Sequence, residues 1–416
     1  MVYGQESNSF DVIVVGGGPG GSTTASFLAD KYNKRVLLLE KETFPRDKTC
    51  GDAISGKSMS VLADLGIQDK IEKVKHLKSY GVILSSPKGT ILDIPFKSDD
   101  PDRHNYGYVC PRLNFDNIVF QHAKSRKNVT TIEKFSVSEV LKEGEQVVGV
   151  KGKNLVTGKE QEFRAKLVVG SDGATSVVAR SLNLEKIEDK HWVISCRAYY
   201  DGITGMKPAI EIHFIKSVMP GYFWIFPTST TEANVGIGML ASDMKKNKVN
   251  LEKAMYAAIE NEPLFKERFK NAKIVSPVKG WNLPLGSKIR TCAGNGFLLV
   301  GDAACLIDPF SGEGIGNAMY SGRLAAQVIH EAFEKNDFTI NHLKTYQNTL
   351  HKELDYELKT SYYLQRLGTV QFFLNWVIAK AARSQSVRDT LSGMLANTKA
   401  KGGLVNPLFY LKLLFA

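Results

Sequence analysis

Near the beginning of the chain, three glycines have the spacing of a phosphate-binding turn. Gly16, Gly18 and Gly21 lie in "VIVVGGGPGGSTTASFLAD", after an apolar run and before a stretch of small and apolar residues. Such glycines permit a tight turn, allow the backbone to approach a pyrophosphate, and let a helix pack closely on a strand. Glu40 ends a second apolar run about twenty residues later, where a carboxylate accepts hydrogen bonds from ribose hydroxyls. The pattern predicts a dinucleotide-binding strand–helix–strand unit.

Two later segments have a related pattern, in which a strand leads into an acidic turn that contains glycine. In "LVVGSDGATSVVAR" the predicted strand covers residues 167–169, and in "GFLLVGDAACLIDPFSGEGIGNAM" it covers residues 297–300. The second segment continues into a predicted helix that begins at Asn317. Backbone N–H groups in such turns bind phosphate and ribitol oxygens. The candidate binding residues are Asp172, Gly173, Gly301, Asp302, Gly314 and Gly316.

These three segments, in this order, resemble the flavoprotein monooxygenase superfamily typified by p-hydroxybenzoate hydroxylase, over about residues 8–330. The resemblance implies FAD as the cofactor. It assigns the first motif to the ADP part of FAD, the Asp–Gly segment to the vicinity of the pyrophosphate, and the Gly–Asp pair to the ribitol. Arg112, in "VCPRLNFDNIV", matches the arginine that helps to hold the FAD in that superfamily.

An aromatic segment, "PGYFWIFP", gives a second indication of function. The alternation of a strand places Tyr222, Trp224 and Phe226 on one face, where they form an apolar wall. Tyr-x-Trp-x-Phe-Pro with a trailing Gly-x-Gly resembles the geranylgeranyl reductase family, whose members use FAD to saturate isoprenoid double bonds. A buried core strand is the alternative interpretation. The resemblance implies these substrate-binding residues: Tyr222, Trp224, Phe226, Pro227, Gly236 and Gly238.

The loop "KTCGDAISG" is a further mark of that family, which has a Cys–Gly pair near the flavin ring. The resemblance implies that Cys50 and Gly51 are active-site residues, together with Tyr222 and Trp224. An isolated trisubstituted alkene is not electron-poor, so protonation must accompany or precede hydride transfer. Aromatic faces stabilise the developing cation by about 0.5 to 2 kcal/mol each and exclude water. The proton donor stays open among Cys50, Tyr222, flavin-bound water and His213.

Other functions remain compatible with an FAD-binding sequence. An aromatic hydroxylase would have the same FAD motifs without the aromatic strand. A flavin-dependent halogenase has Trp-x-Trp-x-Ile-Pro at the equivalent place, and Tyr222 and Phe226 depart from that pattern. A non-catalytic, membrane-associated flavin-binding protein is a third possibility. The sequence favours the polyprenyl reductase.

The remaining residues predict an α/β fold with a Rossmann-type FAD-binding domain and an interleaved antiparallel-sheet substrate domain. Segments such as "HWVISCRAYYDGI" and "EANVGIGML" alternate as strands do, and the end of the chain has a helical pattern. The predicted FAD-binding domain covers residues 1–75, 105–185 and 281–335, the substrate domain covers residues 76–104 and 186–280, and the C-terminal helical region covers residues 336–416.

Composition restricts the partners and the compartment. The five cysteines are scattered and never form C-x-x-C, which indicates a reducing compartment and no metal site. The N-terminus lacks the features of a signal peptide, and no apolar stretch is long enough to span a bilayer. A formal charge of +11 indicates an anionic partner, and nucleic-acid-binding motifs are missing. We expect a cytoplasmic protein, peripheral to the inner face of the membrane.

The resemblance also implies an isoprenoid substrate and an external electron donor. That donor is NAD(P)H or a reduced electron carrier, since the chain has no second Rossmann fingerprint and no iron–sulfur cysteines. In "YYLQRLGTVQFFLNWVIAKAA", residues 362–382, apolar residues at helical spacing predict one helix that packs on the substrate domain or faces lipid. The last residues, "NTKAKGGLVNPLFYLKLLFA", predict an interfacial membrane anchor or a helix that closes the prenyl pocket.

Overall fold

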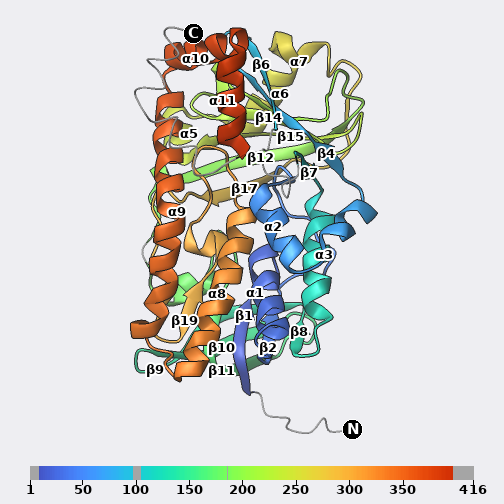
Figure 1. Ribbon diagram of the computed structural model, residues 1–416. Helices are drawn as coiled ribbons and strands as arrows, with labels where there is room; N and C mark the ends of the chain where they lie inside the picture. Colours follow the sequence, from blue (N-terminus) through green and yellow to red (C-terminus); the bar gives the residue numbers. More distant parts are fainter. Residues whose placement is uncertain (1–8, 97–104, 185, 397–416) are drawn as a thin grey trace.

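Two large β-sheets lie at opposite ends of an elongated molecule, with long helices along one side (Figure 1). The computed structural model describes residues 9–96, 105–184 and 186–396. Each sheet draws strands from separate parts of the chain, so the two sheets alternate along the sequence as predicted. The fold therefore brings residues that are far apart in the sequence to the region between the sheets.

The first sheet has the strand order β18–β19–β11–β1–β2–β8, and its central strands are parallel. Residues 12–15 and 36–39 are apolar and buried, as parallel strands covered on both faces require. A hairpin of β9 and β10 extends antiparallel from β11. The strands are β1 (Ser9–Val15), β2 (Val36–Leu39), β8 (Val129–Ile132), β9 (Phe135–Glu143), β10 (Gln146–Asn154), β11 (Glu160–Gly170), β18 (Ala293–Gly294) and β19 (Phe297–Leu299).

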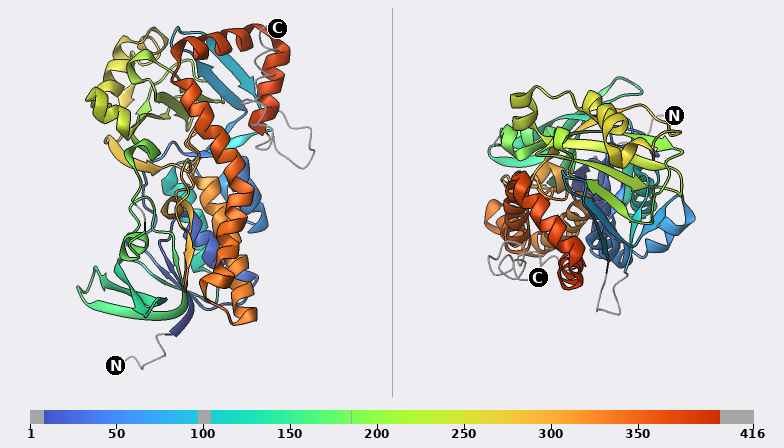
Figure 2. Two further views of the ribbon diagram at one scale, coloured as in Figure 1. Left: turned by 90° about the vertical axis from the view of Figure 1, so that its left-hand side faces the viewer. Right: turned by 90° about the horizontal axis from the view of Figure 1, so that it is seen from above.

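Helices cover one face of this sheet. α1 (Pro19–Asp30) packs between α3 (Arg112–Lys124) and α8 (Ile315–Lys335), whereas the β9–β10 hairpin lies toward the other face (Figure 2, left). Small residues allow the close contact of α1 and α8, because a Cβ at Gly322 would lie 2.5 Å from the backbone oxygen of Gly20. The chain leaves β1 through the glycine turn and enters α1 at the end of the sheet that faces the second sheet.

The second sheet has the order β16–β12–β15–β14–β13–β5–β6, with β17 also paired to β12. Its neighbouring strands are antiparallel except for β13 and β5, which are parallel. The domain boundary predicted at residue 281 falls within β17, whose residues pair with β12. The strands are β5 (Gly81–Ser85), β6 (Ile91–Pro95), β12 (Trp192–Asp201), β13 (Ile210–His213), β14 (Tyr222–Pro227), β15 (Ala233–Leu240), β16 (Lys273–Ile274) and β17 (Lys279–Pro284).

Shorter elements complete the two layers. A small sheet of order β3–β7–β4 follows the loop that contains Cys50. One face of the second sheet packs on α6 and α7, with Phe265 of α7 in the apolar cluster. The elements are α2 (Gly56–Asp64), α4 (Val177–Ser181), α5 (Ala241–Asn247), α6 (Leu251–Asn261), α7 (Pro263–Lys266), β3 (Ala53–Ile54), β4 (Leu77–Ser79) and β7 (Gly107–Val109).

The prediction of one helix over residues 362–382 is wrong. α9 (Ile340–Gly368) ends and α10 (Gln371–Arg383) begins within this segment, and α11 (Gln385–Ala396) follows. The break consists of Thr369 and Val370, directly after Gly368, since glycine and β-branched residues have low helix propensity. No helix in the described part of the chain has the length and hydrophobicity to cross a membrane. The predicted C-terminal anchor begins at Asn397 and lies outside the described residues.

Candidate functional site

A cavity of about 1750 Å³ lies between the two sheets and receives residues from both. It includes most of the residues that the sequence predicts for cofactor and substrate. Five predicted residues do not line it: Gly21, Pro227, Gly236, Gly238 and Gly316. The predicted residues that do line it are Gly16, Gly18, Glu40, Cys50, Gly51, Arg112, Asp172, Gly173, Tyr222, Trp224, Phe226, Gly301, Asp302 and Gly314.

In the glycine turn after β1, some glycines permit close backbone packing and another leaves the backbone open to the cavity. A Cβ at Gly21 would lie 1.9 Å from the backbone oxygen of Gly16, and a Cβ at Gly16 would lie 2.4 Å from that of Ser171. These glycines therefore permit close backbone packing. Gly18 differs, because a Cβ there would come no nearer than 3.7 Å to its closest neighbour, a guanidinium nitrogen of Arg46. The backbone at Gly18 and the first N–H groups of α1 thus face an open part of the cavity, as phosphate binding requires.

Glu40 lies at the same end of the cavity and has a fixed orientation. Its Oε2 accepts a hydrogen bond of 2.7 Å from the Gly17 backbone N–H, and its Oε1 accepts one of 2.8 Å from the Glu42 backbone N–H. A carboxylate oxygen has a second lone pair for a further donor. The geometry therefore leaves Glu40 able to accept hydrogen bonds from a ribose.

The side chain of Asp172 caps a helix. It accepts hydrogen bonds from the Ser176 hydroxyl at 2.6 Å and from the Val177 and Val178 backbone N–H groups, at the start of α4. Burial raises its pKa, although these hydrogen bonds oppose the increase. Gly173, with a positive φ of 77°, has open space where a side chain would lie. The backbone of this turn therefore faces the cavity, whereas the Asp172 carboxylate forms its hydrogen bonds within the turn.

The third predicted segment, which contains Gly301 and Asp302, lies close to Lys48. The carboxylate of Asp302 lies 3.7 Å from the Lys48 ammonium. Gly314 precedes the first residue of α8, so the N-terminus of this long helix also opens near the cavity. Gly316 has a packing role instead, because a Cβ there would lie 2.7 Å from the Ser55 hydroxyl.

Arg112 is buried at the start of α3 and pairs with an acid one turn later. Its guanidinium donates to both carboxylate oxygens of Asp116, at 2.5 and 2.7 Å. Arg46 donates to the same carboxylate at 2.6 Å. Burial tends to lower the pKa of Arg112, but Asp116 and the adjacent Cys50 raise it above its usual value. Arg112 is therefore a permanent positive charge beside residues 46–52, here named the Cys50 loop.

The aromatic residues Tyr222, Trp224 and Phe226 of β14 form one wall of the cavity. The ring centroid of Trp224 lies 6.2 Å from that of Tyr222 and 6.3 Å from that of Phe226 along the strand. The alternate residues, Phe223 and Ile225, point into the apolar core on the other face of the sheet. The Tyr222 hydroxyl donates to the Ser311 backbone oxygen at 2.9 Å, which fixes its ring.

Glycines next to this wall make room for the rings. Trp224 pairs with Gly236 across β14 and β15, and a Cβ at Gly236 would lie 2.2 Å from the indole. A Cβ at Gly51 would lie 2.7 Å from the Phe226 ring. Gly236 and Gly51 thus act through packing, and of these two only Gly51 also lines the cavity.

The proton-donor candidates separate by position. His213 is buried on the opposite face of the second sheet, where it bonds to Ser85 and Glu211 at 2.9 Å each. It does not line the cavity. Cys50 and Tyr222 do line it, and the four other cysteines are buried. Burial raises the pKa of Tyr222, so that its hydroxyl keeps its proton.

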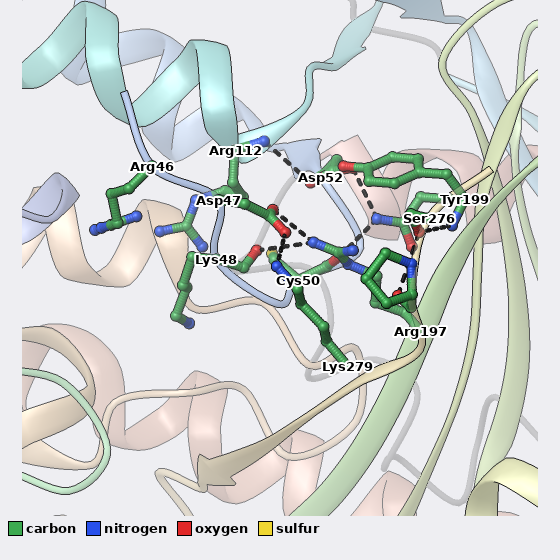
Figure 3. Close-up of polar contacts among 12 residues, drawn as sticks. Arg46, Asp47, Lys48, Cys50, Asp52, Arg112, Arg197, Tyr199, Ser276 and Lys279 are labelled. Carbon is green, nitrogen blue, oxygen red and sulfur yellow. Dashed lines mark hydrogen bonds and ion pairs between the residues drawn. The ribbon is translucent and has the colours of Figure 1, made fainter. Parts of the chain in front are cut away.

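A buried polar network that the sequence analysis missed joins the Cys50 loop to the second sheet (Figure 3). Asp52 accepts hydrogen bonds from the Tyr199 hydroxyl at 2.6 Å and from the Asn234 amide at 2.7 Å. Arg197 donates to Asp47 at 2.6 Å. The sequence offered one weak signal, because Asp52 directly follows the predicted Cys50–Gly51 pair.

Beyond the aromatic wall, the cavity continues along apolar strands. β5 and β13 contribute aliphatic side chains, and neighbouring loops contribute further rings. An extended apolar space of this kind fits a hydrocarbon chain. These lining residues are Val82, Leu84, Phe96, Ile210, Ile212, Phe214 and Phe310.

The residues at the other end fit FAD. An open glycine turn at a helix N-terminus, a fixed carboxylate at Glu40 and the turn at Gly301 border one continuous cavity that reaches the aromatic wall. The donors suit phosphate and the acceptors suit ribose and ribitol hydroxyls.

Comparison with known families and proteins agrees with this geometry. An FAD binding domain matches residues 9–349. The chain is 30% identical over 357 residues to a digeranylgeranylglycerophospholipid reductase of Methanosarcina acetivorans, covering 84% of this chain and 83% of that protein. It is 32% identical over 354 residues to the protein of the same name in Thermoplasma acidophilum, covering 83% and 84%. A menaquinone reductase of Mycobacterium tuberculosis is 29% identical over 328 residues, or 77% of each chain.

Solved structures share the fold. A geranylgeranyl bacteriochlorophyll reductase-like protein from Thermoplasma acidophilum superposes with a TM-score of 0.81 at 24% identity, covering 95% of this chain and 98% of that chain. The flavin-dependent brominase Bmp2 superposes with a TM-score of 0.78, also at 24% identity, covering 93% of each. The cofactor is FAD, as the sequence motifs predict.

Proposed function

Because the chain belongs to the geranylgeranyl reductase family of FAD-dependent oxidoreductases, we propose that it saturates carbon–carbon double bonds of a polyprenyl chain. The carrier of that chain is a lipid, a quinone or a related molecule. The observation that supports this most directly is the continuity of one cavity from the glycine turn, past Cys50, to the aromatic wall and the apolar strands.

In this proposal the apolar strands hold the chain and the aromatic wall faces the reacting double bond. Trp224 and Phe226 are 7% and 9% exposed, so their faces are shielded from bulk water. Water exclusion protects a tertiary cation from being trapped, and the ring faces stabilise its charge. Bound FAD, once reduced, supplies the hydride.

The chain must also supply or relay a proton. Of the three side chains that the sequence offers as donors, Cys50 and Tyr222 line the cavity. The Tyr222 hydroxyl is engaged with the Ser311 oxygen, whereas Cys50 lies beside the Arg112 charge. We propose Cys50 as the residue that holds the proton, with Tyr222 as a wall residue.

The decisive experiment is anaerobic. Protein reduced with dithionite should saturate a geranylgeranyl lipid without oxygen, and Cys50→Ala should lower the rate about 100-fold, as for the loss of a general acid, while FAD stays bound. Tyr222→Phe, which keeps the ring, is the matched control and should have a smaller effect. A requirement for oxygen, with a hydroxylated or halogenated product, would exclude the reductase.

We also propose that α9 and α10 contact a membrane surface from which the substrate is taken. Tyr363 of α9 and Val370, between the two helices, are more than half exposed, and Phe372 of α10 is 81% exposed, although all three are large and apolar or aromatic. Arg366 and Arg383 are exposed on the same two helices. Exposed rings flanked by basic residues are typical of interfacial helices.

An external donor, NAD(P)H or a reduced carrier, supplies the electrons.

A further inference from the structure

Asn234 connects groups that belong to different parts of the cavity. It is completely buried on β15. Its Oδ1 accepts a hydrogen bond of 2.9 Å from the Trp224 indole, and its Nδ2 donates to the backbone oxygen of Cys50 and to Asp52, each at 2.7 Å. One side chain therefore contacts the aromatic wall, the cysteine loop and a buried carboxylate.

These partners permit a single orientation of the Asn234 amide. The Cys50 carbonyl and the Asp52 carboxylate only accept hydrogen bonds, so the amide nitrogen must face them. The indole N–H of Trp224 only donates, so the amide oxygen must face the ring. A flipped amide would lose all three contacts.

Asp52 is itself held from two directions. Tyr199 donates to its Oδ2 at 2.6 Å from β12, and the Arg112 backbone N–H donates to its Oδ1 at 3.2 Å. Asp52 has a positive φ of 70° and no exposed surface. A left-handed backbone at a non-glycine residue persists where surrounding contacts determine it.

The strands bring these residues together by register. Tyr199 pairs with Asn234 across β12 and β15, and Asn234 pairs with Phe226 across β15 and β14. Paired residues share one face of a sheet, so all three side chains lie on the face toward the cavity. Arg197, two residues before Tyr199 and on the same face, holds Asp47 at the start of the loop.

We propose that Asn234 is a positioning residue that fixes the Cys50 loop, residues 46–52, against the Trp224 ring. Asp52 determines the orientation of the Asn234 amide. The catalytic consequence rests on the proposed function, in which Cys50 and Trp224 face the same double bond. The positioning of the Cys50 loop by Asn234 does not rest on the proposed function, because it concerns contacts within this chain. Reactions of this type are sensitive to misplacement of the reacting groups by about 1 Å.

Alkylation of Cys50 tests the link without any substrate. Cys50 is partly exposed and the other four cysteines are buried, so iodoacetamide labelling followed by peptide mass spectrometry reports on this loop. Asn234→Leu keeps the approximate volume and removes all three contacts. We expect Cys50 in this variant to react about tenfold faster than in the wild type, because the loop opens more often.

His213→Leu is the matched control. It removes two hydrogen bonds from a buried residue of the same sheet, on the face away from the cavity, and leaves Glu211 paired with Arg268 at 2.7 Å. We expect it to leave Cys50 labelling unchanged. If Asn234→Leu does not fold, Asn234→Ser takes its place. The serine side chain is smaller and too short to form the three hydrogen bonds of the Asn234 amide. Wild-type labelling rates in the folded Asn234 variant would overturn the proposal.

Kinetics separate this proposal from the proposed function. With a geranylgeranyl lipid, an Asn234 variant should lose kcat about 100-fold with little change in KM. In a Trp224→Phe background the same substitution should cost less, because the indole contact is already gone. Faster labelling in a protein that never reduces an isoprenoid would retain the positioning role and reject the reductase. If the kcat loss of the double variant equals the product of the losses of the two single variants, Asn234 does not act through Trp224, and this part of the proposal is overturned.

Discussion

Glycine and tryptophan occupy matched positions on neighbouring strands of the second sheet. Trp224 lies opposite Gly236, and its indole fills the space that a side chain would otherwise occupy. Two residues farther along, Gly238 has ordinary space, since a Cβ there would lie 3.4 Å from its nearest neighbour, Val193. The Gly-x-Gly pair therefore contains one glycine that the ring requires and one that it does not.

This difference predicts the outcome of two alanine substitutions. Gly236→Ala should destabilise the protein by about 1 to 3 kcal/mol through overpacking and should displace Trp224, lowering turnover. Gly238→Ala should change stability by less than about 1 kcal/mol. Urea unfolding and steady-state rates measure both effects, and equal losses in the two variants would contradict the assignment.

The open side of Gly18 predicts the effect of a larger residue on the cofactor. Gly18→Leu should give colourless protein, because the side chain would occupy the space before α1 where the pyrophosphate is expected. Gly368→Ala should stay yellow, because a Cβ at Gly368 would meet no atom within 4 Å outside its own turn of helix. Flavin absorbance per polypeptide is the measurement. Full FAD occupancy in Gly18→Leu would show that this turn does not bind the cofactor.

Asp52 predicts a dependence of stability on pH. Burial raises its pKa from 3.8 to about 6, although Tyr199, Asn234 and Arg197 favour the ionised form. The folded protein therefore binds this proton more tightly than the unfolded chain, and Asp52 contributes more stability as the pH falls through 6. Between pH 7 and pH 5 the wild type should gain about 1 kcal/mol relative to Asp52→Asn. Urea unfolding at both pH values measures this gain, and an equal change in the two proteins would contradict the raised pKa.

At the scale of elements, α10 has two different faces. Ile378 and Ala381 are buried against Leu92 and Ile94 of β6, whereas Phe372 is exposed. The sequence pattern indicated an apolar helix without showing which side packs. The tertiary structure decides it, because β6 is the edge strand of the second sheet and α10 covers its apolar side chains.

The two faces of α10 predict opposite phenotypes. Ile378→Ala should lower stability by about 2 to 5 kcal/mol, as buried aliphatic truncations do, with membrane binding of the folded protein retained. Phe372→Ser should leave stability within about 0.5 kcal/mol and weaken binding to anionic liposomes. Thermal unfolding and liposome sedimentation distinguish them. Undiminished liposome binding by Phe372→Ser would place the membrane contact elsewhere.

At the scale of the whole molecule, the cavity exists only because the two sheets face each other. Lys48 pairs with Asp302, which follows the first sheet, and the adjacent Asp47 pairs with Arg197 and Lys279 of the second sheet. The loop at residues 46–52 thus joins both halves at the site where the cofactor and the hydrocarbon are expected to meet.

This arrangement predicts a chemical change in the cell's isoprenoids. A strain that lacks the protein should accumulate a more unsaturated polyprenyl lipid or quinone, each missing reduction lowering the mass by about two units, as addition of one hydride and one proton requires. Lipid mass spectrometry identifies the carrier. Restoration by the wild type and not by Cys50→Ala is the control. Unchanged isoprenoid masses would contradict the proposed activity.

Elements with local signatures could be predicted from the amino-acid sequence alone. The turn at Gly16, Gly18 and Gly21, the strand at residues 222–227 and the interleaved α/β order depend on spacing and alternation, which are readable without a fold. The same patterns indicated FAD and the family. They also predicted the shared face of the aromatic residues, since alternation is a property of any strand.

Contacts between residues that are distant in the sequence could be found only in the folded chain. Asp52, Tyr199 and Asn234 have no common motif, and strand register together with the path of one loop brings them within hydrogen-bonding distance. The same register places His213 on the opposite face from the cavity. Local periodicity specifies the face of a residue within its own strand, but the partner of that face depends on long-range pairing, which no single segment of sequence contains.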